Sequence, residues 1–328
     1  MRRTELLSRV LITVAILGAV GTPLFFWART PLIHARIAED GGWIPDVIRA
    51  EVDQPLSLRL TSDDVAHGFA VGGVEMQGVD VLPGEVAEIT LTFENPGIYT
   101  FYCTRWCGLN HWRMRGTIEV GGSNAEAGPA VPPLYVTLGI DIDAPHESRL
   151  TPERRPSAIR GQRLAADLSI PRTSDYYRTH SPQQVFEDLL GTSLIDSQRW
   201  DVVAYVWRSN TTPESLADGG RLYAQNCAAC HGEKGAGDGV FADDLARAGE
   251  ASMQTMAGSE DMTRQTPVDF TDPTRMLGAS PALLQGKILR GGMGTGMPMW
   301  GSILTEEQTW DLIAYIYSFQ FEYQGETQ

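Results

Sequence analysis

The sequence has little cysteine, only four in 328 residues, and little positive charge, with 26 lysine and arginine residues against 41 acidic ones. A secreted scaffold held together by disulfides is cysteine-rich, so that class is excluded. The net charge of -15 excludes a general nucleic-acid binder, because such proteins neutralise phosphates with clustered basic side chains. Hydrophobic residues make up 42% and charged residues 20%, which excludes a wholly disordered chain and, at this length, predicts two or three domains.

A mostly apolar run at residues 10–28 follows a start that contains Arg2, Arg3 and Arg9. A helix of that length spans about 28 Å, enough for the hydrocarbon core of a bilayer. A cleaved signal peptide is the alternative, but no Ala-x-Ala site follows the run. We therefore expect residues 1–30 to form a cytoplasmic N-terminus and a single-pass anchor. The basic end then lies in the cytoplasm, and the domains lie on the periplasmic face of a bacterial inner membrane.

Residues 45–121 have the alternating pattern of short β-strands, separated by turn signals at Leu82-Pro83-Gly84 and Asn95-Pro96-Gly97. They predict a small sandwich or barrel. Residues 121–133 have linker composition, and a helical pattern begins at about Thr211. The alternating apolar positions are Leu56, Leu58 and Leu60 in one run and Ile89, Leu91 and Phe93 in another.

An internal repeat joins residues 191–207, GTSLIDSQRWDVVAYVW, with residues 301–317, GSILTEEQTWDLIAYIY. Both copies predict an amphipathic helix after a polar cap, and Thr305 with Gln308 predicts a capping box. Ser181-Pro182 and Ser280-Pro281 also match, with a shorter offset, so the first copy lacks eleven residues of the second. In the second copy this intervening region holds three methionines. A chance match between two similar helices is the alternative.

Residues 103–114, CTRWCGLNHWRM, place Cys103, Cys107, His111 and Met114 in one loop. Two thiols, an imidazole and a thioether form a soft ligand set that suits copper. A blue-copper site uses one cysteine, whereas two thiolates can bridge two copper ions. A second imidazole is predicted from His67, the histidine of the β region upstream of the loop. A Cys103–Cys107 disulfide or a zinc site is the alternative, and the thioether disfavours zinc.

With this ligand pattern, residues 42–120 resemble the CuA domain of subunit II of the cytochrome c oxidases. The resemblance implies an all-β cupredoxin fold, a Greek-key β-sandwich, and a binuclear copper centre. The single apolar run at the N-terminus is similar to the shorter subunit II of B-type oxidases, whereas many subunits II have two membrane helices. The copper ligands that the resemblance implies are His67, Cys103, the backbone carbonyl of Arg105, Cys107, His111 and Met114.

A second motif, CAACH at residues 227–231, is typical of covalently attached haem. Cys227 and Cys230 would form thioether bonds to the haem vinyl groups, and His231 would become the proximal iron ligand. A helix-like stretch precedes the motif and an aromatic C-terminal helix follows it. Residues 212–321 therefore resemble a class I cytochrome c domain, an all-α fold that carries haem c.

The resemblance implies a methionine as the second axial ligand, a ligand set that raises the reduction potential. Met297 is the first choice because it stands in a Met-Pro-x-Trp pattern. Met299 is the second choice and Met293 the third. The repeat makes residues 165–208 similar to the second half of a cytochrome c, but without CxxCH and without a methionine loop. The duller alternative is two helices that only pack against the haem domain.

These observations predict five regions. An anchor is expected at 1–30, a CuA cupredoxin domain at 31–121 and a linker at 122–133. A degenerate, haem-free cytochrome c-like segment is expected at 134–210 and a cytochrome c domain at 211–328.

The predicted function is electron transfer. The resemblance implies that a donor reduces haem c, that the electron passes to CuA, and that a haem in a separate subunit I receives it for oxygen reduction. We find no catalytic residue in this chain and expect the oxygen-reducing site in that partner. The donor would be a soluble or membrane-bound protein, such as a basic cytochrome c attracted by acidic surface. A CuA-type nitric oxide reductase and a free-standing membrane-anchored shuttle are the alternatives.

Overall fold

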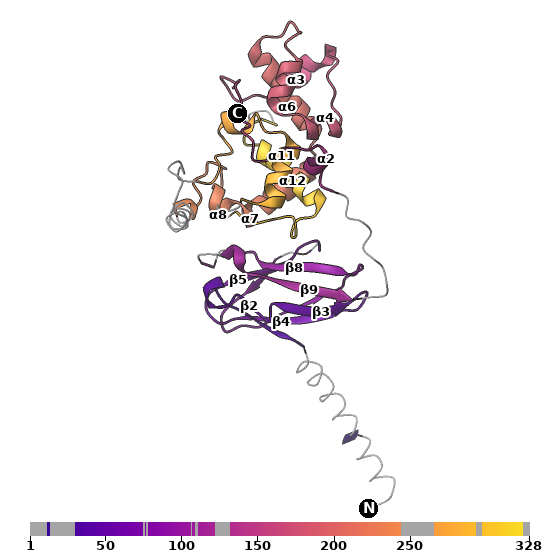
Figure 1. The fold of residues 1–328 in the computed structure, drawn as a ribbon, viewed down its shortest axis with the longest axis vertical. Coiled ribbons are helices and arrows are strands. Elements are labelled where there is room, and N and C mark those ends of the chain that lie inside the picture. The colour runs from indigo at the N-terminus through magenta and orange to yellow at the C-terminus, as the bar shows by residue number, and fades with distance from the viewer. Residues whose placement is uncertain are drawn as a thin grey trace, which may run out of the picture.

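The computed structural model describes residues 12–13, 30–74, 76, 78–105, 107–108, 111–121, 132–243, 266–292 and 297–323. The predicted anchor lies outside this part of the chain except for Ile12, Thr13 and Thr30. Among the described residues no helix has the length and apolar character needed to cross a bilayer. Most of the predicted linker also lies outside. Figure 1 shows a β-sandwich and a helical body, with strand β8 on the side of the sandwich that faces the helices.

The β region folds as a sandwich of two sheets. One sheet has the order β2-β1-β4-β7, and the other has the order β3-β9-β8-β5-β6. The β1–β4 and β3–β9 pairs are parallel and the remaining pairs are antiparallel. The strands are β1 (Leu32–Ala35), β2 (Trp43–Ile44), β3 (Val47–Glu51), β4 (Leu56–Ser62), β5 (His67–Val71), β6 (Val79–Val81), β7 (Ala87–Leu91), β8 (Gly97–Cys103) and β9 (Arg115–Gly121).

The alternating apolar residues fill the space between the sheets, as the sequence predicts. Leu58 and Leu60 of β4 are fully buried, because successive side chains of a strand point to opposite faces. Trp43 packs edge-to-face on both Phe69 and Phe101, with ring centroids 5.5 and 5.8 Å away, and these two rings stack on each other at 5.4 Å. Such edge-to-face contacts fix the aromatic core directly beneath the ends of β5 and β8.

The helical body starts at Leu134, well before the helical pattern noted from Thr211, and the helix predicted within residues 191–207 is present at Asp196–Ser209. Its buried residues form one continuous core from Ala158 to Tyr323. The helices are α2 (Leu134–Thr137), α3 (Ala158–Leu164), α4 (Ser174–Thr179), α5 (Pro182–Asp188), α6 (Asp196–Ser209), α7 (Pro213–Asn226), α8 (Ala228–His231), α10 (Pro273–Met276), α11 (Pro281–Arg290) and α12 (Glu306–Tyr317), with a 3-10 turn η3 (Ala165–Asp167).

Two helix pairs, α3 with α6 and α7 with α12, cross in the same way. A Cβ added at Gly161 would lie 1.8 Å from the carbonyl oxygen of Asp201, and one at Gly219 would lie 2.1 Å from that of Asp311. Each crossing therefore requires glycine, because the two backbones touch there. Asp201 and Asp311 are equivalent in the repeat, so the two units share a helix pair and not the C-terminal helix alone. The sequence analysis predicted the helix before CAACH but missed its counterpart, α3, in the first unit.

The repeat predicts a polar N-terminal cap for both α6 and α12, and the structure has one at α12 only. Thr305 and Gln308 form the predicted capping box at the start of α12. The prediction of a polar cap is wrong for the first copy, because Ile195 precedes α6 and makes no side-chain cap. The Gln198 side chain accepts the Ile195 N–H at 3.1 Å instead. One half of the box is enough to begin this helix because its buried face packs against α3.

Candidate metal and haem sites

The copper loop connects the end of β8 to the start of β9 and contains the 3-10 helix η2 (His111–Arg113). The Sγ atoms of Cys103 and Cys107 lie 4.0 Å apart. Cys107 Sγ also lies 3.5 Å from His111 Nδ1 and 3.1 Å from Met114 Sδ. The four loop residues predicted from the sequence thus converge on one point.

The remaining two predicted ligands face the same point. His67 begins β5, and its Nδ1 lies 3.8 Å from Cys103 Sγ. The backbone oxygen of Arg105 lies 3.1 Å from the same sulfur. Ligand atoms of His67, Cys103 and Cys107 all lie within 4.8 Å of one another, a spacing that a metal centre requires. The Arg105 side chain turns away and pairs with Asp80 through two 2.7 Å hydrogen bonds.

Asp64 orients the buried His67 ring, and the sequence analysis missed it. Its Oδ1 lies 2.7 Å from His67 Nε2 and also accepts the Val65 N–H at 2.6 Å, while Oδ2 accepts the Ile37 N–H at 2.6 Å. Burial raises the pKa of Asp64, but these hydrogen bonds outweigh it and hold the pKa below the ordinary value. A carboxylate on Nε2 directs Nδ1 towards the thiols. An acid in the turn just before a candidate ligand strand is the signal that could have revealed it.

Of the two loop thiols, Cys103 loses its proton readily and Cys107 holds its proton. The hydrogen bond with Cys107 lowers the pKa of Cys103, and the same contact raises the pKa of Cys107. Burial alone lowers the pKa of His67, but hydrogen bonds to Cys103 and Asp64 raise it overall.

Trp43 supports the loop from the core of the sandwich, because its Nε1 donates to the carbonyl oxygen of Met114 at 3.2 Å. The site is therefore rigid on its protein side.

The CAACH motif spans the junction between α7 and α8, where Cys227 ends one helix and His231 ends the next. The His231 ring stacks on Phe270 with centroids 4.5 Å apart, and its Nδ1 lies 3.0 Å from the carbonyl oxygen of Val268. Burial lowers the pKa of His231, which favours the neutral ring. Donation from Nδ1 to a carbonyl leaves Nε2 able to bind iron. Both cysteines are free thiols.

The candidate axial methionines differ in burial. Met297 packs against the helical core, whereas Met299 is 61% exposed. Met293 lies outside the described residues. An axial ligand must reach the haem from inside the fold, so the packing favours Met297, and the assignment stays a prediction.

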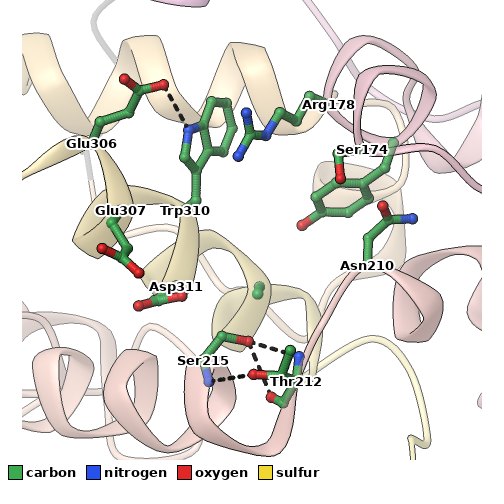
Figure 2. A pocket seen from close by; sticks show the side chains of 11 residues that line it. Ser174, Arg178, Asn210, Thr212, Ser215, Glu306, Glu307, Trp310 and Asp311 are labelled. Carbon is green, nitrogen blue, oxygen red and sulfur yellow. Dashed lines mark hydrogen bonds between the residues drawn. The ribbon is translucent and has the colours of Figure 1, made fainter.

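A cavity of about 470 Å³ lies where α4, α7 and α12 meet, and none of the predicted cofactor ligands lines it. Figure 2 shows Arg178 beside the Trp310 ring, with the guanidinium carbon 4.3 Å from the ring centroid. Glu306 accepts the Trp310 indole N–H at 3.2 Å. Burial and two neighbouring carboxylates raise the pKa of Asp311, also in this cavity, to about 6. The cavity marks the junction of the two helical units.

Comparison with known families identifies the two domains. The model described as the periplasmic domain of cytochrome c oxidase subunit II matches residues 45–120, and the model described as cytochrome c matches residues 216–320. The first match contains all six predicted copper ligands, and the second contains the CAACH motif and Met297.

Curated relatives and solved structures cover part of the chain. Two proteins named cytochrome c oxidase subunit 2, one from Thermus thermophilus and one from a particular strain of the same species, are each 43% identical over 79 residues. These residues are 24% of this chain and 58% and 46% of the relatives, so the match spans about half of their length.

The periplasmic domain of subunit II of a Bradyrhizobium japonicum cytochrome oxidase is 27% identical, over 23% of this chain and 54% of that one, with a TM-score of 0.21. A chain of a haem-copper terminal oxidase dimer is 23% identical, over 36% and 94%, with a TM-score of 0.24.

Proposed function

Because residues 45–120 form a cytochrome c oxidase subunit II periplasmic domain and residues 216–320 a cytochrome c domain, we propose that this chain is the electron-transfer subunit of a haem-copper terminal oxidase. The chain would accept one electron at a time from a donor into haem c and deliver it through a CuA centre to a haem of subunit I. Oxygen would be reduced in that partner subunit. The observation that carries the proposal is the convergence of six soft and carbonyl ligands in a chain that also contains CAACH.

The donor set fits a binuclear copper centre. The two ions would be held by the thiolates of Cys103 and Cys107, with His67, His111, Met114 and the carbonyl of Arg105 as the further ligands. Such a centre supplies one-electron transfer with small changes in ligand geometry. The protein contributes rigidity, because Asp64 holds the His67 ring and Trp43 holds the Met114 backbone.

The second donor set fits haem c. Cys227 and Cys230 would attach the haem covalently, and His231 with Met297 would bind its iron. The hydrogen bond between His231 Nδ1 and Val268 and the stacking on Phe270 fix the imidazole plane. Covalent attachment suits a carrier that must keep its cofactor through many electron transfers.

We assign residues 1–30 to a membrane anchor that keeps both domains on the periplasmic face beside subunit I. We assign the α3–α6 unit to a degenerate cytochrome c-like segment. Its glycine-based helix crossing repeats that of α7 with α12, and residues 134–210 contain no cysteine. The acidic balance of the chain favours a basic donor through long-range attraction.

Purification of the chain from membranes, followed by EPR and optical spectroscopy, tests the proposal. We expect a hyperfine pattern from one unpaired electron shared by two copper nuclei, and a haem that stays attached under denaturing conditions. A pattern from a single copper nucleus would contradict the CuA assignment. Oxygen and nitric oxide consumption by the complex with subunit I would then separate the oxidase from a nitric oxide reductase.

A further inference from the structure

The helical body touches the sandwich beside both candidate cofactor loops. The Gly73 N–H donates to the carbonyl oxygen of Ile303 at 3.1 Å, and Arg115 Nη1 donates to the carbonyl oxygen of Met299 at 3.1 Å. Tyr102 packs against the core of the helical body. The contact surface thus belongs to β8, β9 and the residues just after β5 on one side, and to residues 299–303 on the other.

Strand register explains why this surface lies so close to the copper loop. Tyr102 and Arg115 are paired across β8 and β9, so both side chains point to the same face of the sheet. Their neighbours Cys103 and Met114 are buried inside the sandwich, and the Cys103 N–H donates to the Met114 carbonyl at 3.1 Å. The outward pair therefore faces the helical body while the inward pair faces the candidate copper site.

Gly72 makes the close contact possible. A Cβ at this position would lie 2.6 Å from Ile303 Cα and 2.7 Å from its carbonyl oxygen. No larger residue fits unless the two domains separate. On the sandwich side, the Tyr102 and Arg115 side chains are both partly buried.

From these contacts, and on the basis of the function proposed above, we propose that Arg115 is the residue that couples the two cofactor loops. Its hydrogen bond to Met299 links two covalent segments, Met297-Pro298-Met299 and Met114-Arg115, into one path between the loops. One electron would leave the haem, which is oxidised, and reduce the copper centre, and no bond is made or broken. Gly72 keeps the two loops in contact, and the donor restores the haem electron.

Rapid one-electron reduction of the full chain, followed at the haem and copper absorbance bands, tests this role. We expect Arg115→Met to slow haem-to-copper transfer about tenfold. Loss of one charge-assisted hydrogen bond would lower the population of the arrangement in which the two loops are in contact by about that factor. Arg49→Met is the matched control, because Arg49 lies on the same sheet with 85% of its side chain exposed. The copper EPR and haem spectra of both variants should equal those of the wild type, which separates coupling from damage to a site.

Hydrogen exchange at the Gly73 amide provides a readout that needs no electron transfer. Gly72→Ala should accelerate this exchange and slow the transfer, whereas Gly191→Ala should do neither, since nothing lies within 4 Å of a Cβ at Gly191. Wild-type rates and wild-type exchange in the Arg115 and Gly72 variants would overturn the inference and leave the proposed function intact. A wild-type chain whose reduced haem never reduces copper would overturn both.

Discussion

Asp64 is the residue whose substitution best tests the architecture of the copper site. It accepts hydrogen bonds from His67 Nε2 and from the N–H groups of Ile37 and Val65, all at 2.6 to 2.7 Å. In Asp64→Asn one carboxylate oxygen becomes an NH2 group. That group would face an N–H donor whichever way the amide is turned, so at least one of these contacts is lost.

The expected loss of copper affinity follows from the role of a carboxylate that is hydrogen-bonded to the second ring nitrogen of a ligating histidine. Removal of such a partner typically costs 10- to 100-fold in metal affinity, about 1.4 to 2.7 kcal/mol. Because the His67 ring is completely buried, it has no water to replace the lost partner. We therefore expect weaker copper binding and a changed copper hyperfine pattern, with the cytochrome c spectrum unaltered.

Competition of the purified protein with a copper chelator measures this affinity. Asp63→Asn is the matched control, because the neighbouring carboxylate pairs with His34 and Arg36 on the surface and does not touch His67. Thermal unfolding of both variants shows how much of the change is loss of fold. Equal copper affinities in the two variants, with equal melting temperatures, would refute the reasoning.

Three further predictions concern the helical body. Met297→Ala should shift the haem spectrum towards high spin or a replaced ligand while Met299→Ala leaves it unchanged, and the opposite result would move the axial ligand to Met299. Asp201→Ala should cost about 3 kcal/mol of unfolding free energy, because Asp201 is 1% exposed and binds two arginines; Asp196→Ala, at a position 77% exposed, should cost less than about 1 kcal/mol. Asp311 has a pKa raised from 3.8 to about 6, so the folded state holds its proton more tightly and stability falls as pH rises between these values. Asp311→Asn should remove that fall. After allowance for solvent screening, it should add about 1 kcal/mol to the free energy of unfolding at pH 7 and nothing at pH 3. Chemical denaturation at the two pH values measures the difference, and an equal gain at both would contradict the prediction.

The sequence predicted the sandwich because each strand carries its own signal. Leu58 and Leu60 alternate with polar neighbours, and that period of two is independent of the rest of the fold. The candidate copper ligands could be predicted for a related reason: five of the six lie within residues 103–114, and His67 is the one histidine between residue 45 and that loop. The structure then brings all of these side chains together.

The parts that sequence could not predict depend on contacts between distant segments. Asp64 gains its role only when β5 places His67 under the copper loop. Arg115 reaches Met299 across 184 positions of the chain, and no periodicity signals such a contact. The helix α3 was missed because its match to α7 is a short glycine-centred segment, and its function is visible only where Gly161 meets the backbone of α6.

The continuous core of the helical body has a consequence for maturation. Trp207 of α6 meets Tyr317 of α12 edge to face, with centroids 5.5 Å apart, so the unit without CxxCH supports the last helix of the unit that has it. The α3–α6 crossing is made by the backbones of Gly161 and Asp201, neither of which is a predicted cofactor ligand, so we expect it to close before haem is attached. It would then act as an internal template, holding α12 near its final place while Cys227 and Cys230 are still free to react. On this view the α3–α6 unit serves the order of assembly.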